Sequence, residues 1–242
     1  MPKTIVCFGD SNTWGYVPGS DGERFGRDVR WPARLTTALD DEAEVIAEPN
    51  LPARWQPPPR SAPETPPLVL MLARLEPQKN LSLALRAFAE LLKARPARLL
   101  ILGEGAERRK LEALAARLGI GGAVDMPGYS ADVAGDLARA SALLLSSRYE
   151  GYPAAVVEAL AADVPVVATD CTPCLASLID RPVRGEVVRP AEPAVLAAAL
   201  SRALDLPFTS NGERPTGVAH HDAAASARAY LDLFDRIAAA KA

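Results

Sequence analysis

The sequence has no apolar run that approaches the length of a membrane span, and its N-terminus lacks the long apolar core of a signal peptide. Its 27 lysines and arginines against 30 aspartates and glutamates give a formal net charge of -3, with the cations scattered along the chain. No overall field would therefore recruit a nucleic acid. We expect a cytoplasmic protein with no transmembrane segment and no nucleic-acid partner.

Cysteine is also scarce, with three residues at Cys7, Cys171 and Cys174. This number excludes a disulfide framework. Two neighbouring cysteines cannot complete a tetrahedral zinc site, and we expect no bound metal. Cys171-Thr-Pro-Cys174 has the spacing of a redox motif, whereas the alternative is a pair of small residues in a tight turn. Spacing alone leaves both interpretations open.

Proline, in contrast, is concentrated in one stretch, with eight prolines between residues 48 and 67. Because proline neither donates to a strand ladder nor continues a helix, residues 48–67 are predicted to form an extended linker. The linker separates residues 1–47 from residues 68–242. Within residues 1–47, short strands at 4–8 and 44–47 are predicted to flank a helix at about 32–39, which makes a small βαβ fragment.

From residue 68 onward, apolar strands alternate with amphipathic helices. Residues 68–72 are a continuous apolar run, as expected of a strand buried on both faces. A helix follows it, with Asn80 as the predicted N-cap and Gly119 as the predicted stop of the next helix. Further strands are predicted at 98–102, 124–126, 142–145 and 165–169, and further helices at 106–118, 132–140, 153–162, 192–204 and 222–240. The fold class is α/β, a Rossmann-like parallel sheet with helices on both faces.

In such sheets, ligands bind beyond the carboxyl ends of the strands, so the loops at those ends are the candidate site. Arg74 and Lys79 follow the first strand beside a helix N-terminus, an arrangement that suits a diphosphate. Gly103 and Gly105 follow the second strand, where glycine lets the backbone approach a ligand closely.

The loop after the strand at 142–145 carries Glu150, and the following helix carries Glu158. Pro153 suits the first turn of that helix. One glutamate can then face a sugar while the other faces a ribose. Each of these residues taken alone would be a surface charge or a turn residue. Their combination, with each group at a strand end, indicates a site for a nucleotide sugar.

Three segments resemble the C-terminal domain of glycosyltransferase family 4, which has the two-Rossmann-domain (GT-B) architecture. The segments are ARLEPQKNLSLALRAF from residue 73, LLILGEGAERRKLEALAARLGI from residue 99 and SSRYEGYPAAVVEALAADVPVVATD from residue 146. The resemblance covers about residues 68–205. It departs from the family at Ala73 and Asp163, where glycine is commoner, and at Thr172-Pro173-Cys174, where a glycine-containing turn is usual.

The resemblance implies that Arg74 and Lys79 contact the diphosphate of a nucleotide-sugar donor. It implies a catalytic Glu150 that contacts the donor sugar, and a Glu158 that binds the ribose hydroxyls. The backbone from Met126 to Tyr129 would lie beside the base. The full set of predicted donor-binding residues is Arg74, Lys79, Gly103, Gly105, Met126, Tyr129, Glu150, Gly151, Tyr152, Pro153 and Glu158.

The segment IVCFGDSNTWGY near the N-terminus resembles a different family, the SGNH (GDSL) hydrolases, in which Ser11 would be the nucleophile. This resemblance covers about residues 3–48. A serine nucleophile needs a base and an orienting acid, but the family's Asp-x-x-His and Gly-x-Asn-Asp motifs are missing. The two histidines, His220 and His221, have no aspartate three residues before them. The chain therefore reads as a junction of two families near residues 45–52.

We predict a retaining glycosyltransferase that uses a nucleoside-diphosphate sugar and no cofactor, and whose acceptor is an unidentified glycan, lipid or small molecule. Two alternatives stay open: a serine hydrolase acting through Ser11, and a non-catalytic nucleotide-binding chimera.

Overall fold

The computed structural model describes residues 3–6, 43–46, 60–61, 64–207, 228 and 231–232. The chain divides into two compact units, one made of Met1–Gln56 with Gly217–Ala242 and one made of Pro57–Thr216. Several predictions lie outside the described residues: Ser11, the two histidines, the helix at 32–39, most of the proline-rich stretch and most of the helix at 222–240.

In the first unit, strand β1 (Lys3–Val6) pairs in parallel with strand β2 (Ala43–Ile46). Lys3 lies opposite Ala43, and Val6 lies opposite Ile46. The predicted strands at 4–8 and 44–47 are therefore present, each beginning one residue earlier. A parallel pair requires a crossover connection between its strands, and the helix predicted in that connection lies outside the described residues.

The second unit is built on a six-stranded sheet in which every pairing is parallel. The strand order is β5-β4-β3-β6-β7-β8. The strands are β3 (Leu68–Leu72), β4 (Arg98–Leu102), β5 (Val124–Gly128), β6 (Ala142–Leu145), β7 (Val166–Thr169) and β8 (Gly185–Val188). Every residue of β6 and β7 is buried, as expected for central strands covered on both faces.

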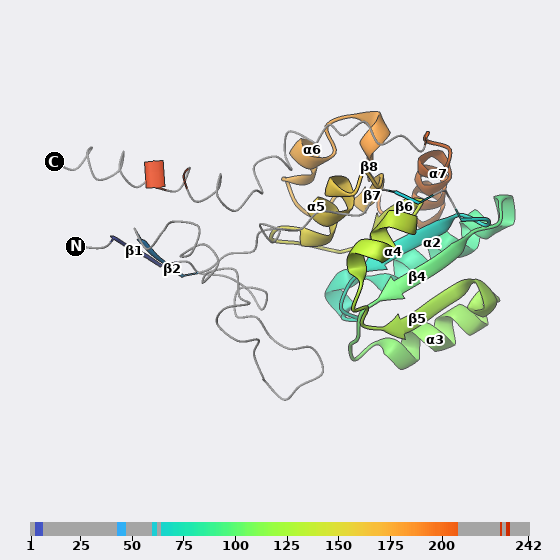
Figure 1. The fold of residues 1–242 in the computed structure, drawn as a ribbon. Helices are drawn as coiled ribbons and strands as arrows, with labels where there is room; N and C mark the ends of the chain where they lie inside the picture. Colours follow the sequence, from blue (N-terminus) through green and yellow to red (C-terminus); the bar gives the residue numbers. More distant parts are fainter. Residues whose placement is uncertain are drawn as a thin grey trace. The chain divides into compact units, whose positions relative to one another are not determined.

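Helices cover both faces of this sheet (Figure 1). They are α2 (Leu81–Ala94), α3 (Arg108–Arg117), α4 (Val133–Arg139), α5 (Ala154–Ala161), α6 (Leu175–Leu178) and α7 (Pro193–Leu204), with 3₁₀ turns η2 (Pro77–Lys79), η3 (Gly121–Ala123) and η4 (Pro182–Arg184). Helix α2 packs against α7 and α3, and its Leu85 and Phe88 are fully buried in the core that these helices share with the sheet.

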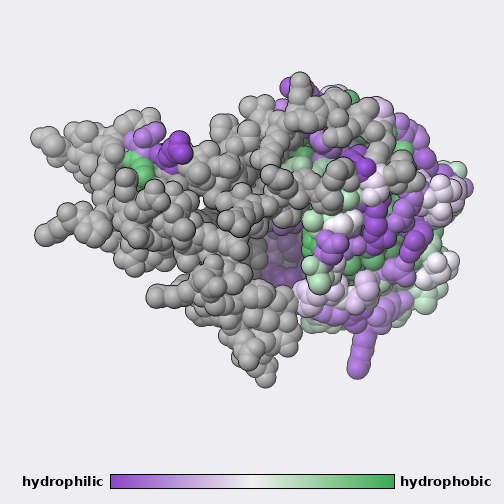
Figure 2. All heavy atoms as spheres, in the orientation of Figure 1, coloured by the Kyte–Doolittle hydropathy of each residue, from purple (hydrophilic) through white to green (hydrophobic). Residues whose placement is uncertain are grey.

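Among the described residues, no helix is long and apolar enough to cross a membrane. On the face drawn in Figure 2, hydrophilic and hydrophobic residues of this unit are interspersed.

The strand order places a topological switch point between β3 and β6. The chain runs outward from β3 through β4 to β5, and then returns to the other side of β3 to form β6. The connections after β3 and β6 therefore diverge at the carboxyl ends of these neighbouring strands. In open parallel sheets this is the position of the ligand crevice.

One local prediction is wrong, two elements were not expected, and one prediction is confirmed. Asn80 does not cap α2 with its side chain, because its backbone is left-handed with φ 50° and its Oδ1 accepts from Arg148 instead, at 3.4 Å. Strand β8 and helix α6 were not expected from the sequence. Gly119, with φ 72°, follows the end of α3 as predicted. Contacts with the second unit begin before residue 68, because the partly buried Arg60 donates to the carbonyls of Ala140 and Asp163 at 2.7 and 2.9 Å.

Candidate functional site

The loops that follow β3 and β6 are joined to each other by backbone and side-chain hydrogen bonds. Ser146 Oγ donates to the carbonyl of Lys79 at 2.8 Å, and the amide of Arg148 donates to the carbonyl of Gln78 at 2.9 Å. Gln78 Nε2 returns a hydrogen bond to the carbonyl of Tyr149, also at 2.9 Å. The two loops thus form one connected surface at the switch point.

Two residues predicted to contact the donor meet within this surface. Nζ of Lys79 lies 2.7 Å from Oε1 of Glu150, and the two side chains are 18% and 8% exposed. Ser147 Oγ donates to the same carboxylate oxygen at 2.5 Å, a normal length for a charge-assisted hydrogen bond. The amide of Glu150 donates to the carbonyl of Cys171 at 3.0 Å, so the backbone of this loop is also tied to the end of β7.

Arg74 begins the loop after β3, and its side chain is exposed. Within the described part of the chain, the side chain of Arg74 has no hydrogen-bond or ion-pair partner. Its guanidinium is therefore available to a ligand at the same edge of the sheet as the Lys79–Glu150 pair. Arg74 also lies near enough to Tyr129 to influence the phenol electrostatically.

The glycines after β4 allow two loops to pack closely, a packing role that the sequence did not indicate. A Cβ on Gly103 would lie 2.1 Å from the carbonyl oxygen of Ala73, and a Cβ on Gly105 would lie 2.5 Å from that of Leu75. Gly103 also has φ 141°, a backbone angle that residues other than glycine rarely adopt. Each glycine therefore approaches the loop that carries Arg74 and Lys79. Their place beside the donor stays a prediction.

Arg108 is a site-supporting residue that the sequence analysis missed. It forms a bidentate pair with Glu104, and its Nη1 donates to the carbonyl of Met126 at 2.8 Å. The amide of Gly103 donates to the carbonyl of Gly128 at 2.7 Å, so these contacts join the carboxyl ends of β4 and β5. The four-residue spacing of Glu104 and Arg108 was the feature of the sequence that could have indicated this ion pair.

Glu104 and Tyr129 are electrostatically linked at the end of β5. The hydrogen bond from Arg108 is the main cause that lowers the pKa of Glu104. Burial and then the nearby Glu104 charge raise the pKa of Tyr129, whose ring is still 49% exposed. A ligand at the end of β5 would therefore meet an aromatic face and a carboxylate that is already paired with an arginine.

Glu158 lies on α5, the helix that follows the loop carrying Glu150. Burial raises the pKa of the Glu158 carboxyl to about 7. No described residue donates a hydrogen bond or an ion pair to this carboxyl. Pro153 immediately precedes α5 rather than standing inside it, while Gly151 and Tyr152 are exposed next to it.

The two cysteines after β7 form part of a turn and are not bonded to each other. The amide of Cys171 donates to the carbonyl of Thr169 at 2.8 Å, and the hydroxyl of Thr172 lies 3.4 Å from Sγ of Cys174. Burial, with a contribution from the charge of Glu150, raises the pKa of the Cys171 thiol to about 11. Because the thiolate is the reactive form, the structure favours the turn over the redox interpretation.

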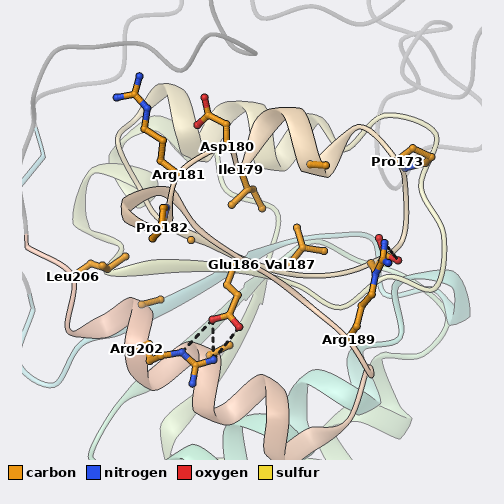
Figure 3. Close-up of a pocket in the computed structure, with 15 residues that line it drawn as sticks. Pro173, Ile179, Asp180, Arg181, Pro182, Glu186, Val187, Arg189, Arg202 and Leu206 are labelled. Atoms are coloured by element: carbon orange, nitrogen blue, oxygen red, sulfur yellow. Dashed lines mark hydrogen bonds and ion pairs between the residues drawn. The ribbon is translucent and has the colours of Figure 1, made fainter.

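A separate cavity of about 740 Å³ lies between α6, β8 and α7. Figure 3 shows Glu186 of β8 facing Arg202 of α7 within it, joined by hydrogen bonds of 2.8 to 3.2 Å. Arg189 pairs with Asp170 at another part of the wall. None of the residues predicted to bind the donor lines this cavity.

Two solved structures share the fold of this chain. The lipopolysaccharide outer core galactosyltransferase WaaB superposes with a TM-score of 0.63 at 22% identity, over 74% of this chain and 52% of that one. Anabaena HepE, crystallised with UDP and glucose, gives a TM-score of 0.52 at 23% identity, over 66% and 43% of the two chains. The fold is thus one that GT-B glycosyltransferases contain over about half of their length.

The family follows from the sequence match. Residues 55–215 match the family described as Glycosyl transferases group 1, and the chain belongs to this family. The match begins after the segment that resembles the SGNH hydrolases, and that resemblance stays a prediction.

Curated relatives are longer than this chain. An exopolysaccharide phosphotransferase of Streptomyces coelicolor is 37% identical over 136 residues, which are 55% of this chain and 14% of the relative. The lipopolysaccharide 1,6-galactosyltransferase of Escherichia coli is 30% identical over 106 residues, which are 42% of this chain and 30% of the relative. The chain therefore matches only a minor part of the length of either protein.

Proposed function

We propose that this chain binds a nucleoside-diphosphate sugar and serves a retaining glycosyl transfer to a glycan, lipid or small-molecule acceptor. The observation that carries the proposal is the meeting of Lys79 and Glu150 at the switch point. The loop that carries Lys79 also carries Arg74, whose side chain has no partner among the described residues. A cation and a carboxylate in contact at this position would each meet a different part of one donor. Family membership and the UDP complexes of proteins with the same fold support the choice of ligand.

The diphosphate would lie against Arg74 and Lys79. Both cations leave the same loop after β3, and this loop leads into the N-terminus of α2. A guanidinium, an ammonium and a helix N-terminus together attract a doubly charged phosphate group. In the transition state they would stabilise the charge that develops on the departing nucleoside diphosphate.

The two glutamates would divide the remaining contacts. Glu150 would contact the sugar through its carboxylate, and Glu158 would bind the ribose hydroxyls. A carboxyl with pKa about 7 can accept hydrogen bonds, and in its protonated form it can also donate one. A ribose diol, which both donates and accepts, would satisfy this largely buried carboxyl.

The base would lie beside Tyr129 at the end of β5. The carbonyls of Met126 and Gly128 already accept hydrogen bonds from Arg108 and Gly103. The exposed Tyr129 ring therefore offers the more available contact for a base. Gly103, Gly105, Gly151, Tyr152 and Pro153 complete the proposed donor-binding set.

Two further predictions from the sequence, the cytoplasmic location and the resemblance to SGNH hydrolases, do not change the proposed activity. The cytoplasmic location expected from the sequence stays a prediction. The resemblance of residues 3–48 to SGNH hydrolases supplies Ser11 without the histidine motif that a serine nucleophile needs.

Calorimetry with UDP, GDP and ADP tests the proposal directly. One of the three should bind to the wild type, and Lys79→Ala should weaken that binding about tenfold or more, because charge-assisted hydrogen bonds are strong. Arg74→Ala/Lys79→Ala should weaken it further. The matched control is Arg109→Ala/Lys110→Ala, which removes two cations from the outer side of α3. Equal affinities in the wild type and the Arg74/Lys79 double variant would overturn the assignment.

A further inference from the structure

We propose that Ser147 is a positioning residue, whose hydroxyl holds the carboxylate of Glu150 when a bound diphosphate draws Lys79 away. This inference rests on the proposed function of the same site. It concerns a residue that forms no part of the predicted donor-binding set.

The carboxylate of Glu150 is held through one oxygen only. Lys79 Nζ and Ser147 Oγ both bind Oε1, at 2.7 and 2.5 Å. Within the part of the chain that the structure describes, Oε2 has no partner. The protein therefore fixes the carboxylate by one edge and leaves its second oxygen for a ligand.

Lys79 cannot serve as a constant support for Glu150. In the proposed function its ammonium contacts a diphosphate, which carries more negative charge than one carboxylate. Movement of Lys79 toward the phosphates would leave the 8%-exposed Glu150 with a weakened partner. A buried carboxylate that loses its hydrogen bonds is strongly destabilised, so a second donor is needed at this moment.

Ser147 can be that donor, because its own position does not depend on the side chain of Lys79. Its side chain is buried, and its carbonyl accepts a hydrogen bond of 2.6 Å from Thr169 Oγ1. The amide of Glu150 is bonded to the carbonyl of Cys171. Both ends of the short turn from Ser147 to Glu150 are thus tied to residues at the end of β7, a strand that pairs with β6 on the side opposite to β3.

The test compares three variants of the full chain in the hydrolysis of the nucleotide sugar whose nucleotide binds. Ser147→Ala should lower kcat roughly 10- to 100-fold, the loss expected for one hydrogen bond to a charged group. Its affinity for the free nucleoside diphosphate should stay within about threefold. Ser147→Thr, which keeps a hydroxyl, should restore most of kcat. Ser141→Ala is the control, because Ser141 is also buried but binds the amide of Leu68 at the opposite end of the sheet.

A crystal structure of Lys79→Ala supplies a readout that needs no turnover. Ser147 Oγ should remain within hydrogen-bond distance of Glu150 Oε1, whereas Glu150 should move in Lys79→Ala/Ser147→Ala. A carboxylate that leaves Ser147 in the Lys79→Ala structure overturns the positioning role. An unchanged kcat in Ser147→Ala, or an equal loss of nucleotide affinity, also overturns it. If no nucleoside diphosphate binds the wild type, the proposed function itself fails, and the positioning role fails with it.

Discussion

The guanidinium of Arg108 donates to the carbonyl of Met126 at 2.8 Å, although these residues belong to different strand–helix units. Arg108 also holds Glu104 through two hydrogen bonds. One side chain thus joins the start of α3 to the ends of β4 and β5. A residue with this position should contribute both to stability and to the shape of the surface near Tyr129.

Arg108→Ala should lower the free energy of unfolding by roughly 1–2 kcal/mol, because it leaves the Met126 carbonyl and the Glu104 carboxylate without their donor. The expected loss of stability is modest because the Arg108 side chain is partly exposed. Urea denaturation measures the effect. The neighbouring Arg109→Ala, on an exposed position of α3, should stay within about 0.5 kcal/mol of the wild type. Equal stabilities of the two variants would contradict the joining role.

Gly103→Ala should be severely destabilising, by roughly 3 kcal/mol or more, because the added Cβ would collide with backbone and the φ of 141° is strained for alanine. The collision is with the Ala73 carbonyl, 2.1 Å away, which no rotamer change relieves. Gly121→Ala is the control, since its Cβ would meet nothing within 4 Å. Thermal unfolding of both variants gives the comparison, and a Gly103→Ala protein as stable as Gly121→Ala would refute the packing argument.

The raised pKa of Glu158 predicts a pH dependence of stability. The folded state holds this carboxyl's proton up to about pH 7, whereas the unfolded chain releases it near pH 4.5. Between these values the folded state binds more protons, so this contribution to stability is complete below pH 4.5 and is lost as the pH rises to 7. Glu158→Gln should therefore gain stability relative to the wild type between pH 5 and pH 8, by about 1–3 kcal/mol. Urea denaturation of both proteins at pH 5 and pH 8 checks this. The same difference in unfolding free energy between variant and wild type at both pH values would refute it.

Glu150→Ala should separate nucleotide binding from reaction. Its carboxylate is proposed to contact the sugar, so the affinity for free UDP or GDP should stay within about threefold, while hydrolysis of the donor should be abolished. Calorimetry and release of free sugar measure the two properties on the same sample. A loss of nucleotide affinity as large as that of Lys79→Ala would show that Glu150 acts on the diphosphate side instead.

Ser11 should show no esterase activity. A serine hydroxyl without a base stays protonated near neutral pH and is a weak nucleophile. Hydrolysis of p-nitrophenyl acetate should therefore be the same in the wild type and in Ser11→Ala. Stoichiometric labelling by a fluorophosphonate probe that disappears in Ser11→Ala would restore the hydrolase alternative.

Much of the second unit could be predicted from local pattern. The strands β3, β4 and β6 have the predicted bounds, because each is a short run with at most one charged residue and is bounded by turn or charged residues. Strand β8 could not be found in this way. It contains Gly185 and Glu186 and is less buried than the central strands, so it lacks a continuous apolar run. Its strand conformation depends on pairing with β7, which is a tertiary interaction.

Some features of the candidate site could likewise be predicted from the sequence, whereas others were visible only in the structure. Sequence placed Arg74, Lys79 and Glu150 in loops at strand ends and Glu158 on the following helix. It did not show that the glycines approach the carbonyls of Ala73 and Leu75. It also made Asn80 a helix cap, whereas the side chain contacts Arg148. In each case the missing information was the position of a loop from a distant part of the chain.

By itself, the sequence determined the alternation of strands and helices and the placing of charged groups after apolar strands, because both depend on the periodicity and burial of neighbouring residues. Only the tertiary structure decided that β3 lies between β4 and β6 and that Lys79 meets Glu150, 71 residues further along. The physical reason is that strand order is set by which apolar faces pack together over the whole core, and no local pattern carries that information. The contact of Ser147 with the same carboxylate oxygen follows from that packing, and so does the expectation that this serine supports the reaction.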